Sequence, residues 1–225
     1  EKPAPTDALR AVSEVAPGAR LRLGSLEPTA VTGPFCAELQ KLPNICDHFH
    51  LSLQSGCDET LGRMKRQYTT AMFYEALYLL RRAYPDCAVT ADLIVGFPGE
   101  TDKEFEKTLA FIKNCAFSSM HIFPYSRRPG TPAANMAGQI GKDVKRDRAR
   151  RAGAAAEEMA LDYADSCIGK TLGVLFERET KGASVGHAGN YMQVSVRTTG
   201  LKGGIYPVRI TGKRDRLLLG ELTEP

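Results

Sequence analysis

The chain has 225 residues, of which 43% are hydrophobic and 25% charged, so it can fill one large domain or a large and a small one. It contains no run of about 20 apolar residues, so we expect no membrane-spanning helix. The net charge of +4 is unevenly distributed. Residues 167–225 carry nine basic and five acidic side chains, whereas the 21 basic and 21 acidic side chains of residues 1–166 cancel. A basic module after a neutral one favours a polyanionic partner such as RNA. A mildly basic domain without such a partner is the alternative.

The cysteines are isolated from one another along the chain. No two are closer than ten residues apart, so the spacings typical of zinc and iron–sulfur ligands are absent. A disulfide framework is not expected in a chain of this size with an ordinary core. We therefore expect reduced thiols and a cytoplasmic protein. The six residues are Cys36, Cys46, Cys57, Cys87, Cys115 and Cys167.

Four strand candidates recur every thirty to forty residues, with helical patterns around them. The strands are expected at 20–26, 47–54, 88–95 and 118–125. Helices are expected at 8–15, at 70–84 and from Thr101, where Glu104 completes a capping box. This alternation predicts parallel βα units. Four units are too few for a closed eight-unit barrel, so the expected fold is α/β with an open or partial barrel.

A long helix is expected from about 142 to 166, carrying KDVKRDRARR. Lys142, Arg146 and Arg150 share one face of this helix, and Asp147 is spaced to pair with Arg151. The pattern fits a solvated helix with surface ion pairs. A contribution to RNA phosphate binding is the other interpretation.

A different pattern begins near Lys170. Short strands separated by glycine-rich turns predict a small antiparallel β-barrel. The expected domains are therefore residues 1–166 and residues 167–225. The four expected strands are KTLGVLFERE, YMQVSVRT, GIYPVRIT and RLLLGELT.

Polar residues alternate with apolar ones along the expected parallel strands. In HFHLSLQSG, His50, Ser52 and Gln54 point away from the apolar side, and in VTADLIV the carboxylate of Asp92 can face the same way. Buried polar groups cost several kcal/mol unless they are partnered, so a polar ligand inside the barrel is indicated. A carboxylate and a carboxamide suit a ribose diol.

Four blocks in order resemble the methylthiotransferases of the radical S-adenosylmethionine (SAM) superfamily. They are RLRLGSLEP, HFHLSLQSGCDETLGRMKRQYT, VTADLIVGFPGETDKEF and HIFPYSRRPGTPAA. The resemblance covers about residues 19–225 and is strongest to the branch that methylthiolates N6-threonylcarbamoyladenosine beside the tRNA anticodon. It implies SAM and two [4Fe–4S] clusters as cofactors. It also implies that residues 167–225 form the RNA-binding TRAM domain.

The resemblance implies particular roles for residues of this chain. Ser25 and Glu27 of SLEP would lie at the edge of the SAM site, Gln54 and Asp92 would hydrogen-bond the SAM ribose, and Arg66 would pair with the SAM carboxylate. An exposed basic residue within RMKR is the alternative for Arg66.

The expected tRNA contacts are basic residues in two places. Arg127 and Arg128 follow the last barrel strand, on the side where the ligand is expected. The others lie in the C-terminal module and are Lys213, Arg214 and Arg216.

The sequence departs from the family at its reactive centre. The family holds its radical-generating cluster with CxxxCxxC, which is absent here, and the first two of six βα units are not found. The chain also begins without Met, so we expect an excised C-terminal portion, catalytically inactive alone, rather than a degenerate paralogue. In the parent enzyme a 5′-deoxyadenosyl radical would abstract the adenosine C2 hydrogen, with methyl from a second SAM. The alternatives are a non-catalytic RNA-binding protein and a methylthiotransferase acting on an Asp of a ribosomal protein.

Overall fold

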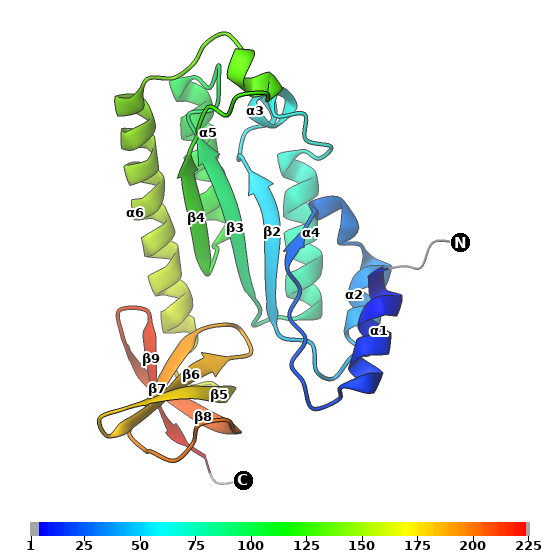
Figure 1. The fold of residues 1–225 in the computed structure, drawn as a ribbon, viewed down its shortest axis with the longest axis vertical. Coiled ribbons are helices and arrows are strands. Elements are labelled where there is room, and N and C mark those ends of the chain that lie inside the picture. Colours follow the sequence, from blue (N-terminus) through cyan, green and yellow to red (C-terminus); the bar gives the residue numbers. More distant parts are fainter. Residues whose placement is uncertain (1–4, 224–225) are drawn as a thin grey trace.

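A computed structural model describes residues 5–223 and shows a parallel α/β sheet followed by a closed β-barrel, as the sequence predicted (Figure 1). The sheet has the strand order β1-β2-β3-β4, and every neighbouring pair is parallel. Its strands are β1 (Ser25–Leu26), β2 (His48–Gln54), β3 (Ala88–Val95) and β4 (Ser119–Pro124). Within residues 5–223 no helix is both long and apolar enough to cross a membrane.

Helices cover one face of this sheet because its strands alternate. Phe49, Leu51 and Leu53 of β2 and Leu93 of β3 are fully buried in the core beneath the helices. The opposite face, which we call the open face, carries polar side chains such as His50 and is less buried. The helices of this part are α1 (Pro5–Val15), η1 (Pro28–Ala30), α2 (Gly33–Leu39), α3 (Asp58–Arg63), α4 (Thr70–Ala83), α5 (Asp102–Cys115) and η2 (Pro132–Asn135).

The first predicted strand, 20–26, is wrong in extent. Only Ser25–Leu26 pair with β2, and Leu21 adds an isolated bridge to Ile45. The backbone of Leu21 bonds to Asn44 and Cys46, before β2 begins, and the side chain of Arg20 contacts the β-barrel. The Arg20 guanidinium donates to the carbonyls of Gly173 and His187, so the chain is held between the two parts of the molecule.

Helix α6 (Lys142–Ser166) links the two parts and has the predicted bounds. It runs beside β4 from the carboxyl ends of the strands to the barrel (Figure 1), about 37 Å at 1.5 Å per residue. The predicted Asp147–Arg151 pair is wrong. Asp147 binds Arg150 at 2.7 Å, and Arg151 reaches across to Glu106 on α5 at 2.6 Å, because Arg151 lies on the side of α6 that packs against α5.

The barrel has five strands where four were predicted. The additional strand, β6, was missed because its residues ASVGHA lack the β-branched and aromatic pattern of the others. The barrel is also not wholly antiparallel, since β7 and β9 pair in parallel. Its strands are β5 (Thr171–Thr180), β6 (Ala183–Ala188), β7 (Gln193–Val196), β8 (Ile205–Arg214) and β9 (Leu217–Leu222).

Candidate functional site

Asp92 lies at the centre of a row of polar side chains that crosses the open face. Its Oδ2 atom is 3.4 Å from Nε2 of His50 on β2, and its Oδ1 atom is 3.3 Å from Nδ1 of His121 on β4. These neighbours follow from the parallel register, which places Asp92 beside His121 and His50 beside Thr90. The two imidazoles hold the carboxylate from both sides, which explains how a central strand accommodates it.

The row continues toward the barrel. The Thr90 hydroxyl lies 2.9 Å from Nδ1 of His50 and 3.3 Å from Nε2 of His48. His48 is buried, and burial lowers its pKa to about 4, with the Arg22 guanidinium acting in the same direction. Its imidazole is therefore neutral at neutral pH, and His48 is a structural member of the row.

A pocket of about 520 Å³ opens at the carboxyl ends of β2, β3 and β4. This volume lies within the range of small-ligand sites, and strand carboxyl ends are where α/β folds bind ligands. Asp92 is 29% exposed, so its carboxylate remains accessible, and the Phe123 ring is half exposed. The pocket is lined by Gln54, Asp92, Ile94, Phe123, Pro124, Tyr125, Ser126, Arg128, Thr131 and Ala133.

Gln54 enters this pocket through an irregularity of β2. Its φ of 64° lies in the left-handed region, and the pairing register with β3 shifts between Leu51 and Gln54. A left-handed conformation at a residue other than glycine costs on the order of 1 kcal/mol and concentrates at functional sites. The buried Tyr68 hydroxyl supports this bend by donating to the Leu53 carbonyl at 3.1 Å. Burial raises the pKa of Tyr68 to about 12, so the hydroxyl stays protonated.

The turn GFPGET after β3 is fixed to α6 by a buried ion pair that the sequence did not reveal. The Glu100 carboxylate accepts from the Gly96 amide and from Arg148 of α6, both at 2.6 Å, and both side chains are almost fully buried. Burial raises the pKa of Glu100, while the Gly96 amide and the Arg148 guanidinium oppose that change. Gly96 has φ 71°, and a Cβ there would overlap the Lys145 side chain, so this position requires glycine.

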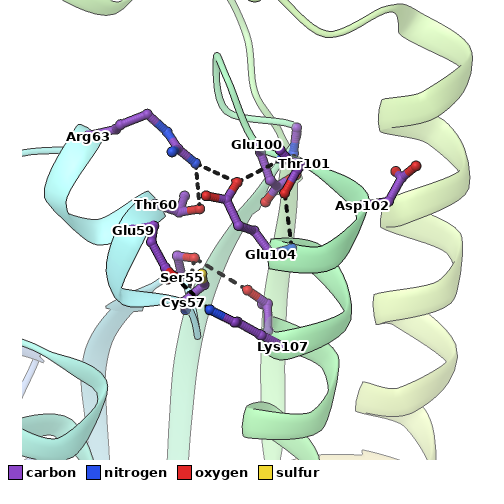
Figure 2. A network of polar contacts seen from close by, with 12 residues as sticks. Ser55, Cys57, Glu59, Thr60, Arg63, Glu100, Thr101, Asp102, Glu104 and Lys107 are labelled. Carbon is purple, nitrogen blue, oxygen red and sulfur yellow. Dashed lines mark hydrogen bonds and ion pairs between the residues drawn. The ribbon is translucent and has the colours of Figure 1, made fainter.

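A second polar network fixes the segment after β2 to α5 (Figure 2). The Arg63 guanidinium donates to Glu104 at 2.7 Å and to Thr60 at 3.1 Å. Glu104 also accepts from the Thr101 amide at 2.7 Å, which confirms the predicted capping box. Together these contacts hold α3 against the start of α5 and so support the β2 end that carries Gln54.

Figure 2 also shows Cys57 within this network, donating to the Glu59 carboxylate at 2.9 Å. Glu59 in turn pairs with Lys107 at 2.6 Å. Burial is the main cause that raises the pKa of the Cys57 thiol, so this cysteine is not a reactive thiolate. Across residues 5–223, no three His, Cys, Asp or Glu side chains form a group able to hold a metal ion.

Of the five predicted cofactor-binding residues, only Gln54 and Asp92 line the pocket. Ser25 is in register with His50 on the neighbouring strand and so shares the open face. Glu27 and Arg66 pair with each other at 3.3 Å and are not among the residues that line the pocket. The Arg66 guanidinium thus already has a carboxylate partner, from the protein itself.

The predicted basic residues have different surroundings. Arg128 lines the pocket, and Arg127 lines a neighbouring groove. Lys213 pairs with Asp165 of α6 at 2.7 Å and Arg216 lies 3.6 Å from Glu157, so both are engaged with that helix.

Arg214 instead lines a groove of about 1050 Å³ on the barrel. Three further basic residues, Arg178, Lys181 and Arg197, line the same groove, and Glu221 is the single acidic residue among its lining. These three residues were not predicted from the sequence. They come together only through the register of the barrel strands, which the order of charges along the chain does not give.

Comparisons with known proteins identify relatives of this chain. Residues 13–112 match the model of the Radical SAM superfamily. The chain is 38% identical over 219 residues to threonylcarbamoyladenosine tRNA methylthiotransferase MtaB of Bacillus subtilis (strain 168), covering 91% of this chain and 49% of that protein. It is 41% identical over 167 residues to tRNA-2-methylthio-N(6)-dimethylallyladenosine synthase of Salinispora arenicola (strain CNS-205), and the match covers 74% of this chain and 33% of that protein. The chain therefore spans half or less of the length of these curated relatives.

Among solved structures, the chain is similar to the radical SAM enzyme coproporphyrinogen III oxidase (HemN) from Escherichia coli. The TM-score is 0.57 at 12% identity, and the match covers 82% of this chain and 49% of that one. At this identity the likeness concerns the fold alone, and it agrees with the parallel sheet and its flanking helices.

Proposed function

We propose that this chain is part of a tRNA methylthiotransferase of the radical SAM superfamily, the family whose model matches residues 13–112. The reaction that we propose adds a methylthio group to C2 of N6-threonylcarbamoyladenosine beside the anticodon. The B. subtilis relative, whose name states threonylcarbamoyladenosine tRNA as its substrate, supports this choice because it matches most of the chain.

The observation that carries the proposal is the convergence of Gln54 and Asp92 on one pocket. A carboxylate accepts hydrogen bonds from the two ribose hydroxyls, and a carboxamide both donates and accepts. The half-exposed Phe123 ring offers an aromatic surface for adenine. A scaffold without a ligand would give no reason for the left-handed Gln54 to turn into this pocket.

The pocket residues fit the nucleoside part of SAM. The Tyr125 hydroxyl is buried at the pocket wall without a hydrogen-bond partner among the described residues, which is a site for a ligand group to satisfy. Asp92 and Gln54 would hold the ribose, and His50 and His121 would keep the Asp92 carboxylate in place. When bound in an enzyme of this kind, SAM supplies the methyl group and the chemistry of hydrogen abstraction.

The cysteines of this chain do not fit an iron–sulfur cluster. All six are buried as free thiols, and none of them belongs to a group of metal-ligating side chains within residues 5–223. We therefore propose that this chain contributes substrate orientation and RNA binding. On its own it is expected to be inactive.

The barrel groove supports RNA binding by this chain. Four basic side chains, from Arg178, Lys181, Arg197 and Arg214, lie around one groove with a single carboxylate. This charge balance suits the phosphates of a polynucleotide. A tRNA substrate and free thiols also fit the cytoplasmic location that the sequence led us to expect.

The proposal is tested by ligand-observed NMR with S-adenosylhomocysteine, a stable analogue that shares the SAM nucleoside. We expect saturation transfer to the ribose and adenine protons in the wild-type chain. Asp92→Asn and Gln54→Ala should each weaken binding about tenfold, the usual value of a hydrogen bond to a charged or buried group. Glu27→Gln is the matched control and should bind normally, because Glu27 is absent from the pocket lining. Absence of transfer in the wild type, or normal binding by both pocket variants, would refute the assignment.

A further inference from the structure

A second concave surface lies directly beside the pocket, at the start of α6. This groove has a volume of about 530 Å³ and shares Pro124, Tyr125 and Ser126 with the pocket wall. Its remaining lining residues are Arg127, Lys142, Lys145, Arg146 and Ala149. Four of the eight are therefore cationic, and none is acidic.

The cations of this groove are available to a ligand. Arg127 and Lys142 are exposed and make no ion pair with any residue in the range 5–223. Arg146 contacts Asp143 at 2.6 Å, but both side chains are about four-fifths exposed, and surface pairs of this kind contribute little. Lys145 is held in position, since its Nζ donates to the Tyr125 carbonyl at 2.9 Å and keeps two further N–H groups.

The distribution of charged residues along α6 is the reverse of the one that the helix dipole favours. Residues 142–151 carry six basic and two acidic side chains, whereas residues 152–166 carry four acidic and no basic ones. The helix dipole favours anions at the amino end and cations at the carboxyl end. The acidic half is explained by its partners on the barrel and on α5, which include Lys213 and Lys113. At the amino end, the four arginines have carboxylate partners, whereas Lys142 and Lys145, which line the groove, have none within residues 5–223.

We propose that this groove binds a backbone phosphate of the RNA strand whose target nucleotide is presented to the SAM molecule in the adjacent pocket. The proposal rests on the proposed function and adds where the strand is held. A phosphate brings the negative charge that three exposed cations and a helix amino end attract. The shared wall at Pro124, Tyr125 and Ser126 places this phosphate next to the pocket, so that gripping the strand also positions the base. RNA binding is thereby divided between this groove, which sets the register, and the barrel groove, which provides additional affinity.

The test is fluorescence anisotropy of the full chain with a labelled RNA anticodon stem-loop over a range of salt concentrations. The variant Arg127→Ala/Lys142→Ala/Arg146→Ala should bind at least about tenfold more weakly at low salt. The slope of log affinity against log salt should fall by roughly 0.7 for each phosphate that the variant no longer neutralises. The single charge reversal Lys142→Glu should act in the same direction. Lys142 is exposed at the first position of α6, so this substitution spares the fold.

A matched control removes the same charge elsewhere. Lys41, Arg82 and Lys103 are exposed and lie outside the groove and outside α6, so their triple alanine variant should lose much less affinity and keep the slope. Equal weakening by the two triple variants would overturn the groove assignment in favour of general charge attraction.

Two further outcomes separate this inference from the proposed function. If the groove variant binds RNA normally while Arg178→Ala/Lys181→Ala/Arg197→Ala on the barrel does not, the groove assignment is wrong and the proposed function stands. If the wild type binds no RNA, both are wrong. The groove variant should retain S-adenosylhomocysteine binding, since none of its three residues lines the pocket.

Discussion

The basic residues near the two ends of α6 differ in whether they have carboxylate partners. At the barrel end, Lys213 and Arg216 of the β8–β9 hairpin are engaged by Asp165 and Glu157 of the helix. At the pocket end, Lys142 and Arg127 have no such carboxylate partners among the described residues. A count of basic residues along the sequence does not distinguish those at the barrel end from those at the pocket end. Only the position of the acidic partners distinguishes cations that join two parts of the protein from cations that remain open to a ligand.

Among the basic residues at the two ends of α6, we expect the largest loss of stability on replacing Arg148. It is the one basic residue of the amino half of α6 that is almost fully buried. Arg148→Met would leave the Glu100 carboxylate buried without its cation. Losing one partner of a buried pair costs about 3–5 kcal/mol. We expect a fall of that size in the free energy of unfolding, measured by urea denaturation at pH 7.

The matched control is Arg150→Met, two residues further along the same helix. Arg150 pairs with Asp147 at the exposed surface, so its loss should cost less than about 0.5 kcal/mol. The double variant Arg148→Met/Glu100→Gln should recover part of the stability, because no buried charge is left unpaired. Equal stability of the two single variants would show that the turn GFPGET is not held by this pair.

Smaller changes in stability and in RNA affinity should distinguish two neighbouring residues of the barrel, Lys213 and Arg214. Lys213→Met removes the pair with Asp165 and the hydrogen bond to the Leu161 carbonyl, and it should cost about 1–2 kcal/mol of stability while leaving RNA affinity unchanged. Arg214→Ala should alter stability by less than about 0.5 kcal/mol. It should also weaken RNA binding with a reduced salt slope, because Arg214 lines the barrel groove. Denaturation and anisotropy on both variants measure this, and the reverse pattern would refute the division of roles.

Much of the fold could be predicted because local signals determine it. The alternation in HFHLSLQSG identified the open face, and Thr101 with Glu104 located the start of α5. The bounds of α6 agree with the long helix predicted around the charged segment KDVKRDRARR. By contrast, β6 carries no strand pattern of its own and forms through its neighbours β5 and β7.

The site was less predictable because its residues meet across long sequence separations. Asp92 could be assigned to the open face from alternation, but its contacts with His50 and His121 depend on the register of three strands. The pairing of Glu27 with Arg66, and of Glu100 with Arg148, depends on side chains 39 and 48 residues apart. No periodicity in the sequence reports contacts of that kind.

The most direct test of the proposed function is nucleoside mass spectrometry of tRNA from the source organism after deletion of the gene that encodes this chain. We predict that N6-threonylcarbamoyladenosine loses its C2 methylthio group. The wild-type gene should restore the modification, and the same gene carrying Asp92→Asn and Gln54→Ala should not. Persistence of the methylthio group after deletion, or full restoration by the double variant, would contradict the proposed function.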